Sequence, residues 1–132
     1  MALSIQSVYL LCQPLIDSYI SFSNEKFEID DFGNKHRSAY DPKYDCITVS
    51  TLEIKYQATY HNIPVPRILL YILLHEIGHS LDPNIHTEKD VITLETTAWK
   101  IADYLMDNLK MPKTKEYFRV RDWALNNYMR KE

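Results

Sequence analysis

A long apolar segment, bounded by prolines on one side and a turn on the other, places the strongest constraint on the fold. Residues 67–82 read RILLYILLHEIGHSLD, and the polar positions inside this run are few. Pro64 and Pro66 precede it, and proline is favourable at a helix start because its missing N–H would be unpaired there. Asp82-Pro83-Asn84 ends the run. The pattern predicts a largely buried helix.

The rest of the chain carries strand signals early and helix signals late. Alternating, β-branched residues predict short strands, and apolar residues at steps of three and four predict helices. The expected strands are 26–30, 36–40 and 46–50, and the expected helices are 2–21 (kinked or split at Pro14), 52–60, 88–110 and 113–130. This order predicts an α+β fold in a single domain over residues 1–132, with a small antiparallel or mixed sheet packed against the helix of residues 67–82.

Charge and cysteine content exclude several classes of protein. The net charge of −3 over 132 residues argues against a nucleic-acid partner, and the basic stretch 112–132 is expected to be a solvated helix face. No segment reaches ~18 uninterrupted apolar residues, so no membrane span is expected. Cys12 and Cys46 are too few for a disulfide framework and are predicted to be buried thiols. We expect a cytoplasmic protein.

His75-Glu76-Ile77-Gly78-His79 is the segment that points most clearly to chemistry. On a helix, His75 and His79 lie one turn apart on the same face, so both imidazoles can reach one ion at the zinc–nitrogen distance of about 2.0–2.1 Å. Glu76 is displaced from the pair but placed to touch a water on that ion, which makes it the candidate general base of a metal-assisted hydrolysis. Gly78 costs roughly 1 kcal/mol of helix stability relative to alanine, which indicates close packing or a site requirement. The alternative is two ordinary histidines in a core helix.

A catalytic zinc ion needs a third protein ligand, and Glu95 is the best candidate. Glu95 borders the apolar stripe of the predicted helix 88–110, where an unpaired carboxylate would be costly to bury. A glutamate that reaches solvent or pairs with a basic side chain is the alternative. Asp82, Glu88 and Asp90 are weaker candidates in or near a turn, where each is expected to be a cap or a solvated charge. His86 is also weaker, because the metzincin pattern H-x-x-G-x-x-H would need Gly at 82 and His at 85, where the chain has Asp82 and Ile85.

The segments HEIGHSLD and ETTAWKIADYLM together resemble the gluzincin-type metallopeptidases, and most of all the ImmA/IrrE group and similar minimal peptidases of phages or mobile elements. In that group an HE[LI]GH helix is followed by an E-x-x-A-x-x-[FI]-A helix, which Glu95, Ala98, Ile101 and Ala102 match. The resemblance implies a zincin-like fold and Zn²⁺ bound by His75, His79 and Glu95. It also implies hydrolysis of a peptide bond in a peptide or protein substrate, through a zinc-activated water with Glu76 as the base.

Several points stay open from the sequence. Thermolysin-like enzymes carry an aspartate four residues after the ligand glutamate, whereas this chain has Trp99, so the partner that orients the histidines is not identified. Ten tyrosines and His61 are available as oxyanion donors, and the sequence does not choose among them. The strand 46–50 is either an edge that pairs with an extended peptide or an interior strand. The alternative function is a non-catalytic zincin-fold domain that acts as a protein-binding or inhibitory module.

Overall fold

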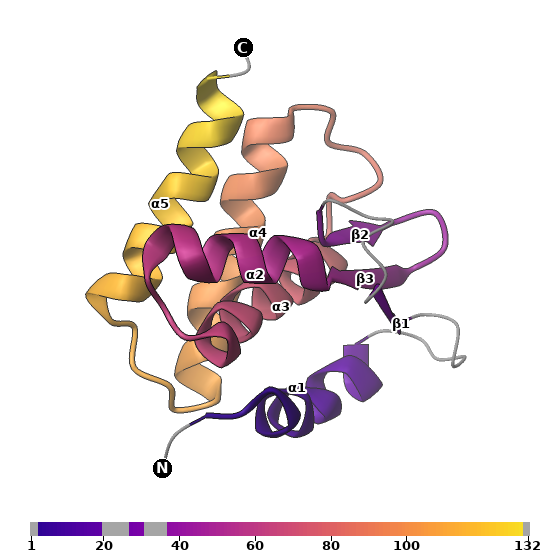
Figure 1. Cartoon of the computed structure of the whole chain (residues 1–132). Helices are drawn as coiled ribbons and strands as arrows, with labels where there is room; N and C mark the ends of the chain where they lie inside the picture. Colours follow the sequence, from indigo (N-terminus) through magenta and orange to yellow (C-terminus); the bar gives the residue numbers. More distant parts are fainter. Residues whose placement is uncertain (1–2, 20–26, 31–36, 131–132) are drawn as a thin grey trace.

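The computed structural model describes residues 3–19, 27–30 and 37–130, and it has the predicted α+β order (Figure 1). One helix precedes a small sheet, and four helices follow it. The elements are α1 Ile5–Tyr19, β1 Phe27–Asp30, β2 Ala39–Asp41, β3 Cys46–Ser50, α2 Thr51–His61, α3 Val65–Leu81, α4 Val91–Asn108 and α5 Lys115–Arg130.

The predicted boundaries hold to within a few residues wherever they can be compared. The outer ends of the helix predicted at 2–21 and the first residues of the strands predicted at 26–30 and 36–40 lie outside the described residues. Pro14 does not split α1, which is helical on both sides of it. The helix predicted from residue 88 begins only at Val91, because the Asp90 side chain caps it by accepting a hydrogen bond from the Thr93 N–H.

The three strands form one mixed sheet in the order β1-β3-β2. β1 runs parallel to β3, with Phe27 opposite Ile47, and β2 runs antiparallel to it, with Tyr40 opposite Ile47. β3 is therefore the interior strand, and its Ile47 and Val49 side chains are buried. Of the two predictions for residues 46–50, the edge strand is wrong, because both sides of β3 already pair with strands.

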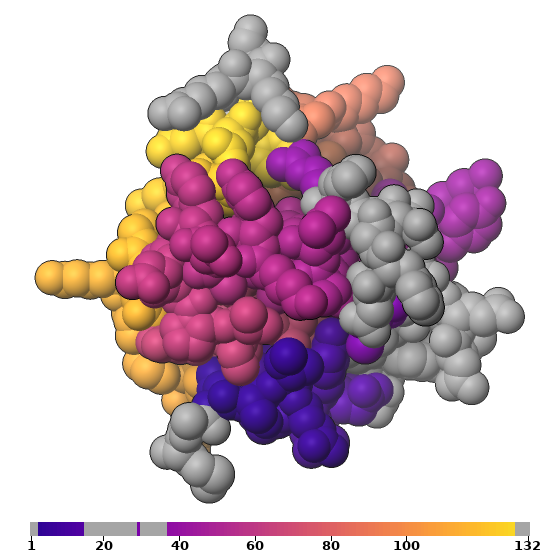
Figure 2. Space-filling model, in the orientation of Figure 1, coloured from indigo at the N-terminus to yellow at the C-terminus, as the bar shows by residue number. Residues whose placement is uncertain are grey.

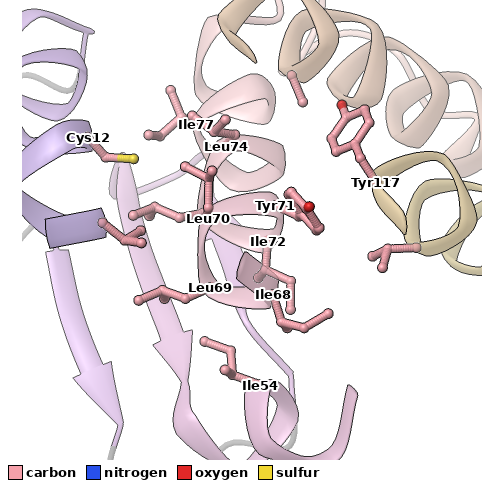
Figure 3. Packing of buried hydrophobic residues seen from close by; sticks show 14 of the residues in the cluster. Cys12, Ile54, Ile68, Leu69, Leu70, Tyr71, Ile72, Leu74, Ile77 and Tyr117 are labelled. Atoms are coloured by element: carbon pink, nitrogen blue, oxygen red, sulfur yellow. The ribbon is translucent and has the colours of Figure 1, made fainter. Parts of the chain in front are cut away.

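α3 is the central helix of the fold, as its apolar sequence predicts. Every residue from 68 to 79 is buried. α1, α2 and α4 pack around it, and Figure 3 shows Cys12 of α1 on one side of α3, Tyr117 of α5 on the other and Ile54 of α2 near its lower end. The Tyr71 and Tyr117 rings meet edge to face with their centroids 5.2 Å apart. The two histidines of the motif therefore lie on a helix that the surrounding elements hold in place.

The two cysteines differ in their surroundings. Burial raises the pKa of the Cys12 thiol to about 12, so Cys12 is an unreactive core residue, as expected. Cys46 is partly exposed, so the prediction of a buried thiol is wrong there. Cys46 is the first residue of β3, where its position opposite Asp41 at the end of a short strand leaves it incompletely covered.

Hydrogen bonds lock the start of α2 to the segment before β2. Ser50 caps α2 by accepting a hydrogen bond from the Glu53 N–H, and its own N–H donates to Ser38 Oγ. The Glu53 carboxylate in turn accepts a hydrogen bond of 2.8 Å from the Ser38 N–H. These contacts fix Glu53 and the N-terminal turn of α2 relative to the sheet.

None of the helices within residues 3–19 and 37–130 combines the length and apolar character needed to cross a membrane.

Candidate metal centre

Three buried side chains converge where α3 and α4 pack against each other. His75 and His79 come from α3 and Glu95 comes from α4. Glu95 Oε2 lies 2.8 Å from His75 Nε2 and 3.2 Å from His79 Nε2. One ligand atom from each residue lies within 4.8 Å of the others. The three residues predicted from the sequence thus meet in one group that could hold a metal ion.

Gly78 allows α3 and α4 to approach closely enough for this meeting. A Cβ atom added at Gly78 would lie 3.1 Å from the Ala98 carbonyl carbon and closer still to its oxygen. Ala98 is one turn after Glu95, on the same side of α4. The predicted close packing at Gly78 is confirmed, and it brings the Glu95 carboxylate within reach of both histidines.

The groups around the site favour a positive charge at its centre. Burial alone would raise the pKa of Glu95, but hydrogen bonds from His75 and His79 hold that pKa far below its usual value. Burial also opposes a charged His79, yet the hydrogen bond with Glu95 and the nearby carboxylates of Glu76 and Asp82 raise the pKa of His79 above its ordinary value. A proton or a metal cation can supply this charge.

Glu76 lies next to the ligand group but is not part of it. Its side chain is buried, and this burial raises the pKa of Glu76, an effect that His75 and His79 oppose. Glu76 and His75 both line a cavity of about 410 Å³. Glu76, the residue after the first histidine of the motif, therefore borders this cavity.

The weaker ligand candidates serve the chain turn between α3 and α4 instead. Asp82 is buried and its carboxylate accepts a hydrogen bond of 2.8 Å from the Asn84 N–H. The Glu88 carboxylate accepts one from the Asp90 N–H, and Asp90 caps α4. His86 is exposed. None of the four belongs to the group of ligand atoms found among the described residues, and the hydrogen bonds of Asp82, Glu88 and Asp90 agree with the predicted capping roles.

Trp99 occupies the place where thermolysin-like enzymes carry an aspartate, and it contacts His75 directly. Its ring stacks on the His75 ring with centroids 4.5 Å apart. The Nδ1 atom of His75 is buried and has no hydrogen-bond partner among the described residues. The His75 ring thus lies between the stacked face of Trp99 and the Glu95 carboxylate that contacts its Nε2 atom.

Tyr128 of α5 comes close to Glu95, although the two residues are far apart in the sequence. Burial raises the pKa of its hydroxyl, and so does the hydrogen bond between that hydroxyl and the Glu95 carboxylate. The guanidinium of Arg37 lies over the Tyr128 ring, 5.4 Å from its centroid. The only sequence signal for Tyr128 was its position on the apolar stripe of the last helix, which predicts burial but not a contact with Glu95.

His61, the other oxyanion candidate named from the sequence, lies elsewhere. Its ring packs edge to face against Tyr60 and Trp123, with centroids 5.0 Å apart in each case. The residue ends α2 and does not line the cavity. Of the oxyanion donors that the sequence offers, the tyrosines and His61, the structure therefore brings one tyrosine, Tyr128, close to Glu95 and leaves His61 away from the cavity.

Comparisons of the chain with protein-family models, with curated proteins and with solved structures found no match. The assignment of a function therefore depends on the geometry and chemistry of the site itself. The resemblance to gluzincin-type peptidases stays a prediction from two sequence segments.

Proposed function

We propose that the chain is a zinc-dependent metallopeptidase in which His75, His79 and Glu95 hold the metal ion and Glu76 is the general base. One observation carries this proposal: three buried ligand atoms from α3 and α4 converge beside a cavity whose wall includes Glu76. A purely structural zinc site has no use for a carboxylate at that position. The resemblance of the two helices to the gluzincin pattern supports the same assignment.

The donor set fits zinc. Two imidazoles and one carboxylate form a three-ligand set typical of catalytic zinc sites, which leave a further position open. Ligand atoms around a tetrahedral zinc ion lie roughly 3.3 Å apart. The distances from Glu95 Oε2 to the two Nε2 atoms, 2.8 and 3.2 Å, are close to this value.

Zinc, when bound, supplies a Lewis acid that lowers the pKa of water and polarises a carbonyl. Glu76 takes the proton of the attacking water and passes it to the leaving amine. A raised pKa suits this role, because a general base works best when its pKa lies near the working pH. The buried position of Glu76 therefore serves the reaction as well as the packing.

Tyr128 is the best-placed donor for the oxyanion in this proposal. Its hydroxyl is at the ligand group, as the hydrogen bond to Glu95 indicates, and its side chain also lines the cavity. A phenol O–H can donate to the oxygen that becomes negative in the transition state. Because Tyr128 lies on α5, the site needs the C-terminal helix as well as the helix pair that carries the ligands.

The proposal is tested by cleavage of a mixed peptide library with and without a chelator, read by mass spectrometry. We expect the parent protein to cleave peptides only with its metal present. Glu76→Gln preserves the shape but cannot take a proton, so it should keep the metal and lose on the order of 10²-fold or more in kcat. Glu88→Gln, a matched change in the turn, should cleave like the parent.

The same experiment separates the peptidase from the non-catalytic alternative. A parent protein that binds one metal ion per chain but cleaves no peptide in the library would favour a protein-binding or inhibitory module. Cleavage by Glu76→Gln at the parental rate would remove Glu76 from the role of general base. Elemental analysis of protein purified without added metal tests the identity of the ion.

A further inference from the structure

We propose that the cavity beside His75 is a subsite for a large apolar side chain of the substrate, preferably an aromatic one. The inference rests on the proposed function, because it names the class of residue that lies near the peptide bond to be cleaved. It is carried by the lining of the cavity, by the surface next to it and by the charges in its wall.

Aromatic side chains from three helices form much of the cavity wall. Tyr56 comes from α2, Trp99 from α4, and Trp123 and Tyr128 from α5. Trp99 also stacks on His75, so the aromatic lining is continuous with a metal ligand. Leucine, isoleucine, valine and alanine side chains complete the apolar part of the wall. An aromatic side chain bound in such a cavity gains stabilisation from edge-to-face and stacked contacts, in addition to that from burial of its apolar surface.

The cavity continues onto the surface as an exposed stripe on α2. Leu52, Tyr56 and Tyr60 are spaced four residues apart and are 44%, 58% and 57% exposed. The Tyr56 and Tyr60 rings stack at 6.0 Å, and Tyr60 lies 5.3 Å from the Trp123 ring. α2 lies at the front of the molecule in Figures 1 and 2, with part of its surface open to solvent in that view. A stripe of this kind that runs into a cavity fits an extended apolar peptide segment.

The charges in the wall favour a neutral side chain over a charged one. Glu53 and Glu76 repel an acidic side chain, and the positive charge of Arg37, which also lines the cavity, is offset by the nearby Glu53 carboxylate. Glu53 already accepts a hydrogen bond from the Ser38 N–H, and the neighbouring Arg37 supplies the positive charge near it. A lysine or arginine side chain of the substrate would therefore find the Glu53 carboxylate already hydrogen-bonded to Ser38, and it would be repelled by the positive charge of Arg37 nearby. The net charge of −3 also disfavours an acidic ligand such as a nucleic acid.

Binding to the cavity can be measured directly, because both tryptophans of the chain line it. Zinc-loaded Glu76→Gln protein is titrated with four heptapeptides that differ only in a central Phe, Ala, Asp or Lys, and tryptophan emission is recorded. We expect the Phe peptide to bind at least roughly 10-fold more tightly than the Ala peptide, and more tightly than the Asp peptide, which Glu53 still repels in this variant. Equal affinities for Phe and Ala, tightest binding of the Lys peptide, or no change in emission up to millimolar peptide would each overturn the subsite.

Tyr56 and Tyr104 offer a matched pair of variants, since both are exposed tyrosines on helices but only Tyr56 lines the cavity. In the Glu76→Gln background, Tyr56→Ala should reduce the preference for Phe over Ala to within about 3-fold, because it removes one wall of the subsite. Tyr56→Phe should restore the preference, and Tyr104→Ala should leave it unchanged. An unchanged preference in Tyr56→Ala contradicts the assignment.

Cleavage by the parent protein separates the subsite from the peptidase itself. We expect cleaved library peptides to be enriched in Phe, Tyr, Trp, Leu or Met next to the scissile bond. Cleavage with no such enrichment overturns the subsite and leaves the peptidase in place. Tyr56-dependent binding of the Phe peptide without any cleavage supports the subsite as a peptide-binding site and counts against the peptidase.

Discussion

The indole of Trp99 lies almost flat against the imidazole of His75, with ring centroids 4.5 Å apart and planes inclined by 25°. Metal-binding histidines usually donate their second ring N–H to a carboxylate, a carbonyl or a water, which fixes the ring. The Nδ1 atom of His75 lacks such a partner among the described residues. Among the described residues, the His75 ring is therefore contacted by the Trp99 indole on its face and by the Glu95 carboxylate at its Nε2 atom.

We predict that Trp99→Leu lowers zinc affinity by on the order of 10-fold, because partners that orient a ligand typically contribute this much. Trp99→Phe keeps an aromatic face against His75 and should retain most of the affinity. Competition with a chromophoric chelator measures both values. Since Trp99 is buried, the thermal stability of each metal-free variant is recorded as a control. Equal affinities of the Leu and Phe variants would show that stacking has no role.

Glu95→Ala should weaken zinc binding far more than Glu88→Ala, Asp90→Ala or His86→Ala. The substitution leaves two histidine ligands, and the other three residues lie in the turn, outside the ligand group. The difference in thermal midpoint between zinc-loaded and chelator-treated protein should shrink for Glu95→Ala alone. The third ligand would instead lie in the turn if zinc still raised the thermal midpoint of Glu95→Ala as much as that of the parent protein, and no longer raised the midpoint of His86→Ala or Asp90→Ala.

Tyr128→Phe should lower kcat by about 10²–10³-fold with little change in KM, if its hydroxyl stabilises the oxyanion. The ring remains, so the contact with Arg37 is retained and the fold should be unaffected. Zinc content is measured in parallel. A loss of zinc with a proportional loss of activity would instead mean that Tyr128 acts by positioning Glu95 through their hydrogen bond.

Gly78→Ala should destabilise the protein by about 1–3 kcal/mol or more, because the new methyl group would overlap the Ala98 backbone. Backbone atoms cannot rotate away, so α4 must move, and Glu95 moves with it. We therefore expect zinc affinity to fall as well. Chemical denaturation and chelator competition measure the two effects. Ser80→Ala, on the same helix, is the control and should change both only slightly.

The stability of the chelator-treated protein should depend on pH through His79 and Glu95. The raised pKa of His79 contributes stability that is fully present below its unfolded value of 6.5 and lost as the pH rises through the folded value. The lowered pKa of Glu95 contributes stability present above 4.5 and lost as the pH falls through the folded value. This contribution should therefore be greatest between about pH 5 and 6.

Zinc affinity should show the opposite trend on the alkaline side. Zinc must displace the proton of His79, so affinity should rise from pH 6 to 8 while the stability of the metal-free protein falls. Denaturation and chelator competition across this range measure both. His86→Gln removes an exposed histidine and should leave both profiles unchanged. A zinc affinity that does not vary with pH would show that His79 is not a ligand.

Much of the fold and of the candidate metal centre follows from local sequence patterns. The apolar run of residues 67–82 can be stable only if it is buried, and α3 is indeed the buried central helix. The spacing of His75 and His79 places both on one helix face, whatever the rest of the chain does. Glu95 was predicted from the cost of burying a carboxylate, and Gly78 from the cost of glycine in a helix.

The tertiary structure decided the features that depend on residues far apart in the chain. Periodicity showed that Tyr128 is on an apolar stripe, but only the packing of α5 brings it to Glu95. The cavity lined by α2, α3, α4 and α5 likewise has no local signal, nor does the pairing that makes β3 an interior strand. The physical reason is that spacing along one helix or strand fixes neighbours on that element, whereas contacts between elements depend on how their surfaces pack.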